Sequence, residues 1–231
     1  MTDAAAPLPG PGLEERLASV ESQIDDAARE AGRDPKDITT VVVTKFHSAA
    51  LVRELFALGV RDFGESRHQE ASVKIAELAD LTATWHFIGQ LQSKKARLVR
   101  SYTDVIHSLD RESLVDALDG PSAIDVFVQV NLTSDPERGG VAADHLDALV
   151  ERAMAAPGIT VRGLMAVAPL DVEPRAAFAE LRRLSERVQR TFPTVNALSM
   201  GMSGDFREAI LEGATHLRIG SAITGNRAAH G

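Results

Sequence analysis

Hydrophobic and polar positions along the chain alternate between two patterns, one typical of buried strands and the other of amphipathic helices. Short apolar or β-branched runs predict strands at 38–44, 60–64, 84–88, 104–108, 124–131, 161–167, 195–200 and 216–220. Apolar residues at helical spacing predict helices between them at 49–58, 67–78, 93–99, 111–118, 143–155, 174–190 and 205–212. Regular alternation of this kind is typical of a parallel sheet covered by helices.

One further helix is predicted ahead of the first strand. Its apolar positions run from Leu13 to Ala31, and Gly32 follows where a C-cap is expected. Residues 1–12 contain three Pro, two Gly and a run of Ala without periodicity, so we expect a disordered tail there.

Eight strand and helix units predict the fold class α/β, as a single (β/α)8 TIM-type barrel with an extra N-terminal helix. No linker or shift in composition interrupts the chain after the tail, so residues 13–231 are expected to form one domain. An open doubly wound sheet is the alternative.

Composition narrows the classes of partner. The formal net charge of -8 argues against a nucleic acid or an anionic membrane, because either calls for a basic surface. Cysteine is absent, and the seven His show neither an HxH nor an HExxH spacing, so we expect no metal site. His86 and His107 fall inside predicted strands and are expected to be hydrogen-bonded core residues. Without a long apolar run or a signal peptide, the protein is expected in the cytoplasm.

Lys45 ends the Val/Thr run of the first predicted strand. One interpretation places its ammonium in water with its stem on the core. The other is a nucleophilic amine, its pKa lowered by desolvation, that forms a Schiff base with a carbonyl compound. Because the chemistry of such barrels lies at the carboxyl ends of the strands, Lys45 is a candidate functional residue.

The ends of the last two predicted strands indicate an anion site. Ser203 follows a glycine-containing turn, while Arg218 and Gly220 share one strand face and Ser221 opens the final loop. These two loops often bind phosphate in such barrels. The alternative is a Gly-rich turn with an arginine paired to a core carboxylate. A lysine facing a phosphate site suits a phosphorylated aldehyde such as pyridoxal 5'-phosphate.

Six blocks of sequence occur in the order of a known family, at 42–45, 62–65, 85–89 with 91–93, 163–166, 198–203 and 218–223. In these blocks the chain resembles the pyridoxal phosphate homeostasis proteins of the YggS/PROSC type, whose fold is similar to the barrel domain of alanine racemase. The resemblance covers nearly the whole chain after the tail.

The resemblance implies that Lys45 holds pyridoxal 5'-phosphate as a Schiff base. It also implies a set of cofactor-binding residues, which besides Lys45 are Ser66, Met165, Ser199, Met202, Ser203, Arg218, Gly220 and Ser221. Among them, Ser203, Gly220 and Ser221 would bind the phosphate, and Arg218 the phosphate or the pyridine side. Two positions depart from the family pattern, since Ser66 replaces the usual Asn and Lys94-Lys95 replaces Asn-Lys.

The function implied is cofactor binding in vitamin B6 and amino-acid homeostasis, without an established reaction and without catalytic residues. A racemase or lyase using the same cofactor is the alternative, and a Schiff-base enzyme for a sugar phosphate is a third hypothesis. A racemase would need a second acid or base, whereas Tyr102, the one Tyr, is expected on the side of the barrel away from the site.

Three further expectations complete the prediction. Because no residues remain for the second domain of a racemase, we expect a monomer with an open cofactor site, and recipient enzymes that use pyridoxal phosphate as possible partners. Glu65 is either a carboxylate near the cofactor ring or a structural partner for a cation at the rim. The basic cluster at 94–97 is either a solvated helix face or a docking patch for an acidic partner.

Overall fold

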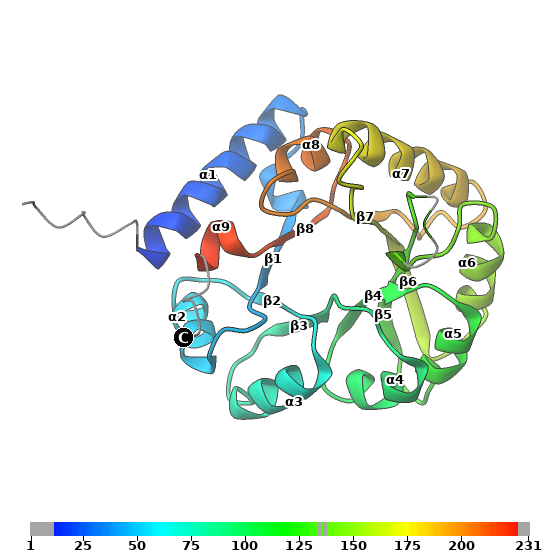
Figure 1. Cartoon of the computed structure of the whole chain (residues 1–231), viewed down its shortest axis with the longest axis horizontal. Coiled ribbons are helices and arrows are strands. Elements are labelled where there is room, and N and C mark those ends of the chain that lie inside the picture. Colours follow the sequence, from blue (N-terminus) through cyan, green and yellow to red (C-terminus); the bar gives the residue numbers. More distant parts are fainter. Residues whose placement is uncertain (1–11, 134, 136–137, 226–231) are drawn as a thin grey trace, which may run out of the picture.

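The strands of the protein close into a parallel barrel in which each strand lies beside its neighbours in the sequence, from β1 to β8 (Figure 1). The computed structural model describes residues 12–133, 135 and 138–225. The predicted (β/α)8 barrel with its extra N-terminal helix is confirmed. Apart from Gly12, the predicted tail lies outside the described residues.

Strands and helices alternate along the chain as predicted. The strands are β1 (Thr39–Val43), β2 (Asp62–Glu65), β3 (Thr84–Phe87), β4 (Val105–Leu109), β5 (Ile124–Gln129), β6 (Ile159–Met165), β7 (Ala197–Ser199) and β8 (His216–Ile219). The helices are α1 (Leu13–Glu30), η1 (Pro35–Asp37, a 3-10 turn), α2 (Ala49–Ala57), α3 (His68–Glu77), α4 (Ser93–Arg100), α5 (Glu112–Leu118), α6 (Leu146–Met154), α7 (Pro174–Gln189), α8 (Phe206–Leu211) and α9 (Ser221–Thr224).

The strand boundaries differ from the prediction by up to two residues at either end. The predicted strand 161–167 begins and ends two residues earlier, as β6, and Val167 is 41% exposed in the following loop. The predicted strand 195–200 shortens to β7, which pairs with β8 only through Ser199 and His216. Apolar residues there pack as loop residues, so hydrophobicity alone overestimates strand length. Helix α9 was not predicted, because four residues are too short to show a helical period.

Helix α1 joins the two ends of the barrel domain. Its apolar face is buried, and the helix lies alongside α8 and α9 in Figure 1. Nε of Arg16 donates a 2.7 Å hydrogen bond to the carbonyl of Ile223 in α9, and Nη1 of Arg33 donates one of 2.7 Å to the carbonyl of Ala214. The first contact holds the segment that follows β8, where predicted site residues lie, and the second holds the turn that precedes β8.

The barrel interior is more polar than is usual for this fold, in which branched aliphatic side chains dominate. His86 is 2% exposed and His107 is fully buried, and their rings are hydrogen-bonded to each other at 2.9 Å. The prediction that both are hydrogen-bonded core residues is confirmed. The aliphatic core lies instead between the sheet and the surrounding helices.

Candidate functional site

A cavity of about 650 Å³ opens at the carboxyl ends of the barrel strands. It is bounded by the loops after β1, β2, β3, β6 and β7 and by the turn between β8 and α9. The predicted site residues that line it are Lys45, Ser66, Met202, Ser203, Arg218, Gly220 and Ser221. The fold therefore gathers residues from both ends of the sequence around one space.

Two other predicted site residues lie deeper in the barrel. Met165 is 2% exposed and packs with Val105 and Phe127 inside the barrel. Ser199 is fully buried and accepts a hydrogen bond from Arg218. Neither side chain lines the cavity. Ser199 thus supports the cavity floor through Arg218, and direct contact of either residue with a ligand stays a prediction.

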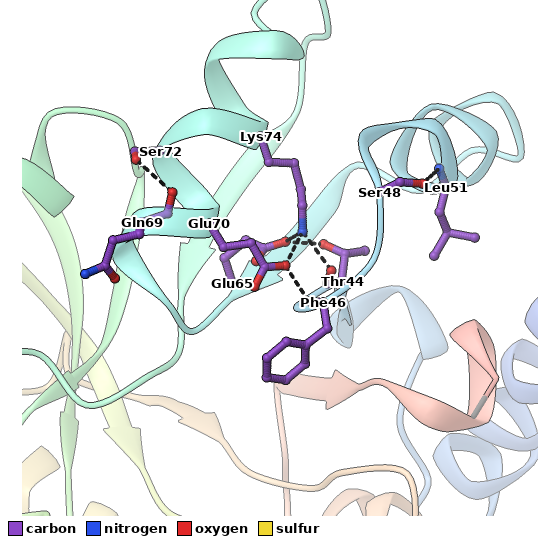
Figure 2. Close-up of polar contacts among 9 residues, drawn as sticks. All are labelled: Thr44, Phe46, Ser48, Leu51, Glu65, Gln69, Glu70, Ser72 and Lys74. Atoms are coloured by element: carbon purple, nitrogen blue, oxygen red, sulfur yellow. Dashed lines mark hydrogen bonds and ion pairs between the residues drawn. The ribbon is translucent and has the colours of Figure 1, made fainter. Parts of the chain in front are cut away.

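Lys45 lies two residues beyond the end of β1, with an exposed side chain on the cavity wall. Its backbone neighbours are held by a cluster of charged side chains, which we call the Lys74 cluster (Figure 2). Nζ of Lys74 is 2.7 Å from Oε1 of Glu65 and 3.0 Å from Oε1 of Glu70. It also donates a 2.9 Å hydrogen bond to the carbonyl of Thr44.

The hydroxyl of Thr44 adds a further contact, since Oγ1 donates a 2.7 Å hydrogen bond to Oε1 of Glu65. Glu65 is therefore the structural partner of a cation, which is one of the two roles expected for it. Burial raises the pKa of Glu65, and the contacts with Lys74 and Thr44 oppose that shift. With Thr44 bound at both its carbonyl and its hydroxyl, the cluster fixes the backbone immediately before Lys45.

The residue after Lys45 is held in an uncommon conformation. Phe46 has a φ of 69°, in the left-handed region that residues other than Gly rarely adopt. Such a residue costs about 1–3 kcal/mol unless its surroundings hold it. Its N–H donates to Oε1 of Glu70, and the guanidinium of Arg67 lies 4.5 Å from the centre of its ring. The Lys74 cluster thus binds the chain on both sides of Lys45.

Arg218 is a buried cation that faces the cavity without a carboxylate beside it. The residue is 4% exposed; Nη1 donates to Oγ of Ser199 at 2.7 Å and Nη2 to the carbonyl of Ala166 at 2.9 Å. Among the described residues, no carboxylate lies within ion-pair distance of it, so the pairing with a core carboxylate that the sequence allowed is absent. Burial lowers the pKa of Arg218 to about 10, and Asp205 partly opposes that shift. A desolvated cation beside a cavity favours a ligand that accepts hydrogen bonds.

A chain of hydrogen bonds continues from Arg218 through the barrel interior. Oγ of Ser199 is 2.8 Å from Nδ1 of His107, whose Nε2 is 2.9 Å from Nδ1 of His86. Nε2 of His86 is in turn 3.0 Å from Oδ1 of Asp62. Because Oγ of Ser199 accepts a hydrogen bond from Arg218, its hydroxyl can donate to Nδ1 of His107. Nε2 of His107 can then donate to His86, and Nε2 of His86 to Asp62.

His107 is neutral in this arrangement, and its surroundings favour that state. Burial, with the nearby charges of His86 and Arg218, lowers the pKa of His107 well below its usual value. The orientation of Arg218 is therefore fixed by a network that crosses from β7 through β4 and β3 to β2.

The turns after β7 and β8 bring two backbone donors to one point on the cavity wall. Oγ of Ser203 accepts the N–H of Gly220 at 3.2 Å and that of Ala222 at 3.3 Å. The turn needs Gly201, which has a φ of 93°, because an added Cβ would lie 2.6 Å from Cβ of Ala209. Two N–H groups and a hydroxyl that converge in this way form a suitable site for a phosphate oxygen.

Sequence reasoning missed several residues of this region. Phe46 and His47 also line the cavity, and Glu70 and Lys74 hold its wall. A signal for the last two was present, since residues four apart on a helix face each other and can form an ion pair. Nothing in the sequence pattern indicates that this pair is buried, because a Glu and a Lys on a helix are typical of a solvated face.

Tyr102 lies outside the cavity lining. Its backbone precedes β4, as predicted, and its hydroxyl is 3.0 Å from Nδ1 of His68, the first residue of α3. Burial raises the pKa of Tyr102 to about 12, with a smaller contribution from the charge of Glu65. Within the described ranges, no group of three or more acidic or histidine side chains is placed to hold a metal ion.

Comparison with known proteins assigns the family. Residues 16–228 match the model of the alanine racemase N-terminal domain. The chain is 41% identical over 220 residues to the pyridoxal phosphate homeostasis protein of Pseudomonas aeruginosa, a match that covers 93% of this chain and 96% of that relative. The chain belongs to the pyridoxal phosphate homeostasis protein family. Its relative of that name in Escherichia coli is 35% identical over 222 residues, with 91% and 95% of the two chains covered.

Solved structures place the pyridoxal phosphate homeostasis family beside the racemases in fold. A structure of PipY from Synechococcus elongatus with pyridoxal phosphate bound is similar at a TM-score of 0.82 and 37% identity, and the match covers 93% of this chain and all of PipY (100%). Alanine racemase from Corynebacterium glutamicum matches at a TM-score of 0.68 and 15% identity, over 93% of this chain and 64% of the racemase. The second likeness shows the fold alone. In the part of the chain that the structure describes, no helix is long and apolar enough to cross a membrane.

Proposed function

We propose that this protein binds pyridoxal 5'-phosphate in the cavity at the carboxyl end of its barrel, holds it through Lys45 as a Schiff base, and acts in vitamin B6 and amino-acid homeostasis. One observation carries the proposal: an amine, a buried guanidinium and a convergent set of phosphate donors line the same cavity. The cofactor carries an aldehyde, a ring nitrogen and a phosphate, for which these groups are suitable partners. The family relationship and the pyridoxal phosphate in PipY support it.

The individual residues fit this ligand. The N–H groups of Gly220 and Ala222, with the hydroxyls of Ser203 and Ser221, would bind the phosphate. Arg218 would donate to the pyridine side or to a phosphate oxygen. A cavity of about 650 Å³ is of ordinary size for a cofactor site. When bound, the cofactor supplies a carbonyl group for covalent attachment and an electron-accepting ring.

We further propose that the protein holds and hands over the cofactor rather than turning over a substrate. A guanidinium, unlike a carboxylate, does not keep a ring nitrogen protonated, and the hydrogen bonds to Ser199 and Ala166 hold Arg218 in place. Tyr102, the side chain expected of a second racemase base, is bound to His68 outside the cavity lining. The racemase or lyase alternative has one observation in its favour, since His47 lines the cavity close to Lys45 in the sequence.

Borohydride reduction tests the attachment. Protein loaded with pyridoxal phosphate and then reduced should carry the cofactor on Lys45 alone, as identified by peptide mass mapping. A cofactor fixed on another lysine, or none fixed after loading, would contradict the proposal. The carrier role is tested on the same loaded protein with a panel of amino acids. We expect no racemisation or loss of amino acid, whereas turnover that Lys45→Ala abolishes would establish the enzyme alternative.

The remaining expectations concern the cellular setting. We place the protein in the cytoplasm as a monomer, with enzymes that use pyridoxal phosphate as recipients of the cofactor. Light scattering on the purified chain should give the mass of a single copy, and transfer should be visible as activation of a cofactor-free enzyme by the loaded protein.

A further inference from the structure

A second cavity, of about 350 Å³, adjoins the cavity proposed for the cofactor. It lies between the loop after β2 and the loop after β3, and Ser66 lines both cavities. The two loops are in close contact, because a Cβ added at Gly89 would lie 2.2 Å from the carbonyl oxygen of Ser66. Ser66 is therefore the residue at which the linings of the two cavities meet.

The lining of the second cavity is rich in hydrogen-bond donors and contains no carboxylate. Its polar side chains, besides Ser66, are Arg67, His68, Gln69, Gln90, Gln92 and Lys95. Phe87 and Leu91 supply an apolar surface beneath them. Two cations, an imidazole and three amides in one cavity are notable in a chain whose formal net charge is -8. This composition selects for a small anion with an apolar portion.

The charges of the cavity are not neutralised by acidic neighbours. Within the described residues, neither Arg67 nor Lys95 forms an ion pair with a carboxylate. The two acidic side chains near Arg67 in the sequence, Glu65 and Glu70, are both paired with Lys74, and Glu70 also accepts the N–H of Phe46. A carboxylate that enters the cavity would thus meet two cations without a competing partner.

Two of the lining side chains are already held in position. The guanidinium of Arg67 lies over the ring of Phe46, which itself lines the cofactor cavity next to Lys45. Nδ1 of His68 is hydrogen-bonded to the hydroxyl of Tyr102. Side chains ordered before binding lose less entropy when a ligand arrives.

The order of the strands gives the cavity its relation to the cofactor site. Around the barrel, β7 and β8 are followed by β1 and then by β2 and β3. The phosphate donors follow β7 and β8, Lys45 follows β1, and the second cavity follows β2 and β3. In strand order, the second cavity therefore lies on the side of Lys45 away from the phosphate donors.

We propose that this second cavity binds the carboxylate of a small amino acid or organic acid beside the cofactor. The position beside the cofactor rests on the proposed function, whereas carboxylate binding itself follows from the lining residues alone. Lys95 and Arg67 supply the charge, the glutamine amides supply further donors, and Phe87 with Leu91 receives the apolar part of the acid.

The test uses propionate as the probe and propionamide as its neutral counterpart. Each is titrated into the isotopically labelled full chain, and the NMR amide resonances of the loops after β2 and β3 are followed. Propionate should shift these resonances and propionamide should not. Lys95→Gln and Arg67→Gln should each weaken propionate binding about tenfold, because each removes a charge-assisted hydrogen bond. The matched control is Lys94→Gln, which removes the same charge from an exposed neighbour that does not line the cavity and should change binding less than about twofold.

Three outcomes would overturn the proposal: equal shifts with propionate and propionamide, equal weakening by Lys94→Gln and Lys95→Gln, or tighter binding of inorganic phosphate than of propionate at the same resonances. The titration is run on protein with and without pyridoxal phosphate, and cofactor loading of each variant is read separately from its absorbance. Failure of the wild-type protein to load would count against the proposed function alone, since propionate binding to the cofactor-free chain is measured independently.

Discussion

Burial of the Arg218 guanidinium is unfavourable for folding and favourable for binding a ligand in the cavity. Its guanidinium is desolvated and has hydrogen bonds to Ser199 and Ala166 but no carboxylate within ion-pair distance in the described structure. Replacing such a buried charge by an apolar side chain is often neutral or stabilising. A substitution of Arg218 should therefore lower ligand affinity without lowering the stability of the fold.

For Arg218→Met we expect cofactor affinity to fall by about 10- to 100-fold, the equivalent of one charge-assisted hydrogen bond. The free energy of unfolding of the cofactor-free protein should stay level or rise. Titration with pyridoxal phosphate and urea unfolding measure the two quantities. Unchanged affinity would exclude Arg218 as a ligand contact.

Ser203 tests the phosphate site. Ser203→Ala removes the hydroxyl that accepts the N–H groups of Gly220 and Ala222 and that is placed to donate to a phosphate. We expect it to weaken binding of pyridoxal phosphate about tenfold while leaving pyridoxal, which lacks the phosphate, within about twofold of its original affinity. An equal loss for both ligands would show that Ser203 acts on the ring side or on the fold.

At the residue scale, the sequence allowed prediction of the side chains that follow strand ends. Lys45, Ser203 and Ser221 were accessible to prediction because a parallel barrel places every strand terminus at one rim. Met165 and Ser199 belong to the same sequence blocks, yet they lie within strands and point into the barrel below the cavity. Family resemblance alone does not separate a lining residue from the residue that supports it.

At the scale of elements, the Lys74 cluster connects α3 and the end of β2 to the loop after β1. Lys74→Met leaves Glu65 buried, and Glu70 half-buried, without their cation and should lower the free energy of unfolding by about 3 kcal/mol or more. It should also weaken attachment of the cofactor, because Thr44 and Phe46 lose the contacts that hold the backbone around Lys45.

The matched control is the exposed ion pair between Arg53 and Asp80, in which Asp80→Asn should leave the free energy of unfolding nearly unchanged. Urea unfolding of both variants measures the change in stability, and titration with pyridoxal phosphate measures the change in cofactor attachment. A Lys74→Met protein as stable as the Asp80→Asn protein would contradict the importance of the cluster.

The elements themselves were predictable because buried strands and amphipathic helices have different periods. The loops between them were not, since their conformation depends on tertiary contacts. The positive φ of Phe46 is an example, because it is maintained by Glu70 and Arg67 from a different element. The length of β7 is another, as it depends on its pairing with β8.

At the scale of the whole molecule, the histidines in and beside the barrel interior predict acid sensitivity. Burial lowers the pKa of His216 to about 4 from an ordinary value of 6.5. The unfolded chain therefore takes up a proton first, so this stabilisation is complete above about pH 6.5 and is lost as the pH falls to about 4. The shift corresponds to about 3 kcal/mol, and His107 adds to the loss in the same direction.

Urea unfolding at pH 7 and at pH 4.5 tests this expectation. His216→Gln should reduce the loss of stability between the two pH values, whereas His145→Gln, at an exposed histidine, should leave it unchanged. If the stability of the wild type and of His216→Gln depended equally on pH, His216 would not be a source of the acid sensitivity.

The overall architecture was the most predictable property, since the eight repeated units and the barrel they form depend on patterns spread over the whole chain. The polar barrel interior was only partly predictable. His86 and His107 were recognised as core residues, but the chain of hydrogen bonds from Asp62 to Arg218 joins five strands that the sequence does not place in register.

The central claim is that Lys45 tethers pyridoxal phosphate, and the visible absorbance spectrum of the loaded protein tests it most directly. Wild-type protein freed of unbound cofactor should be yellow, with the absorption band of a lysine-bound pyridoxal. Lys94→Ala, at an exposed lysine that does not line the cavity, should keep that band, and Lys45→Ala should lose it. A band that persists in Lys45→Ala, or a wild-type protein that stays colourless after loading, would contradict the claim.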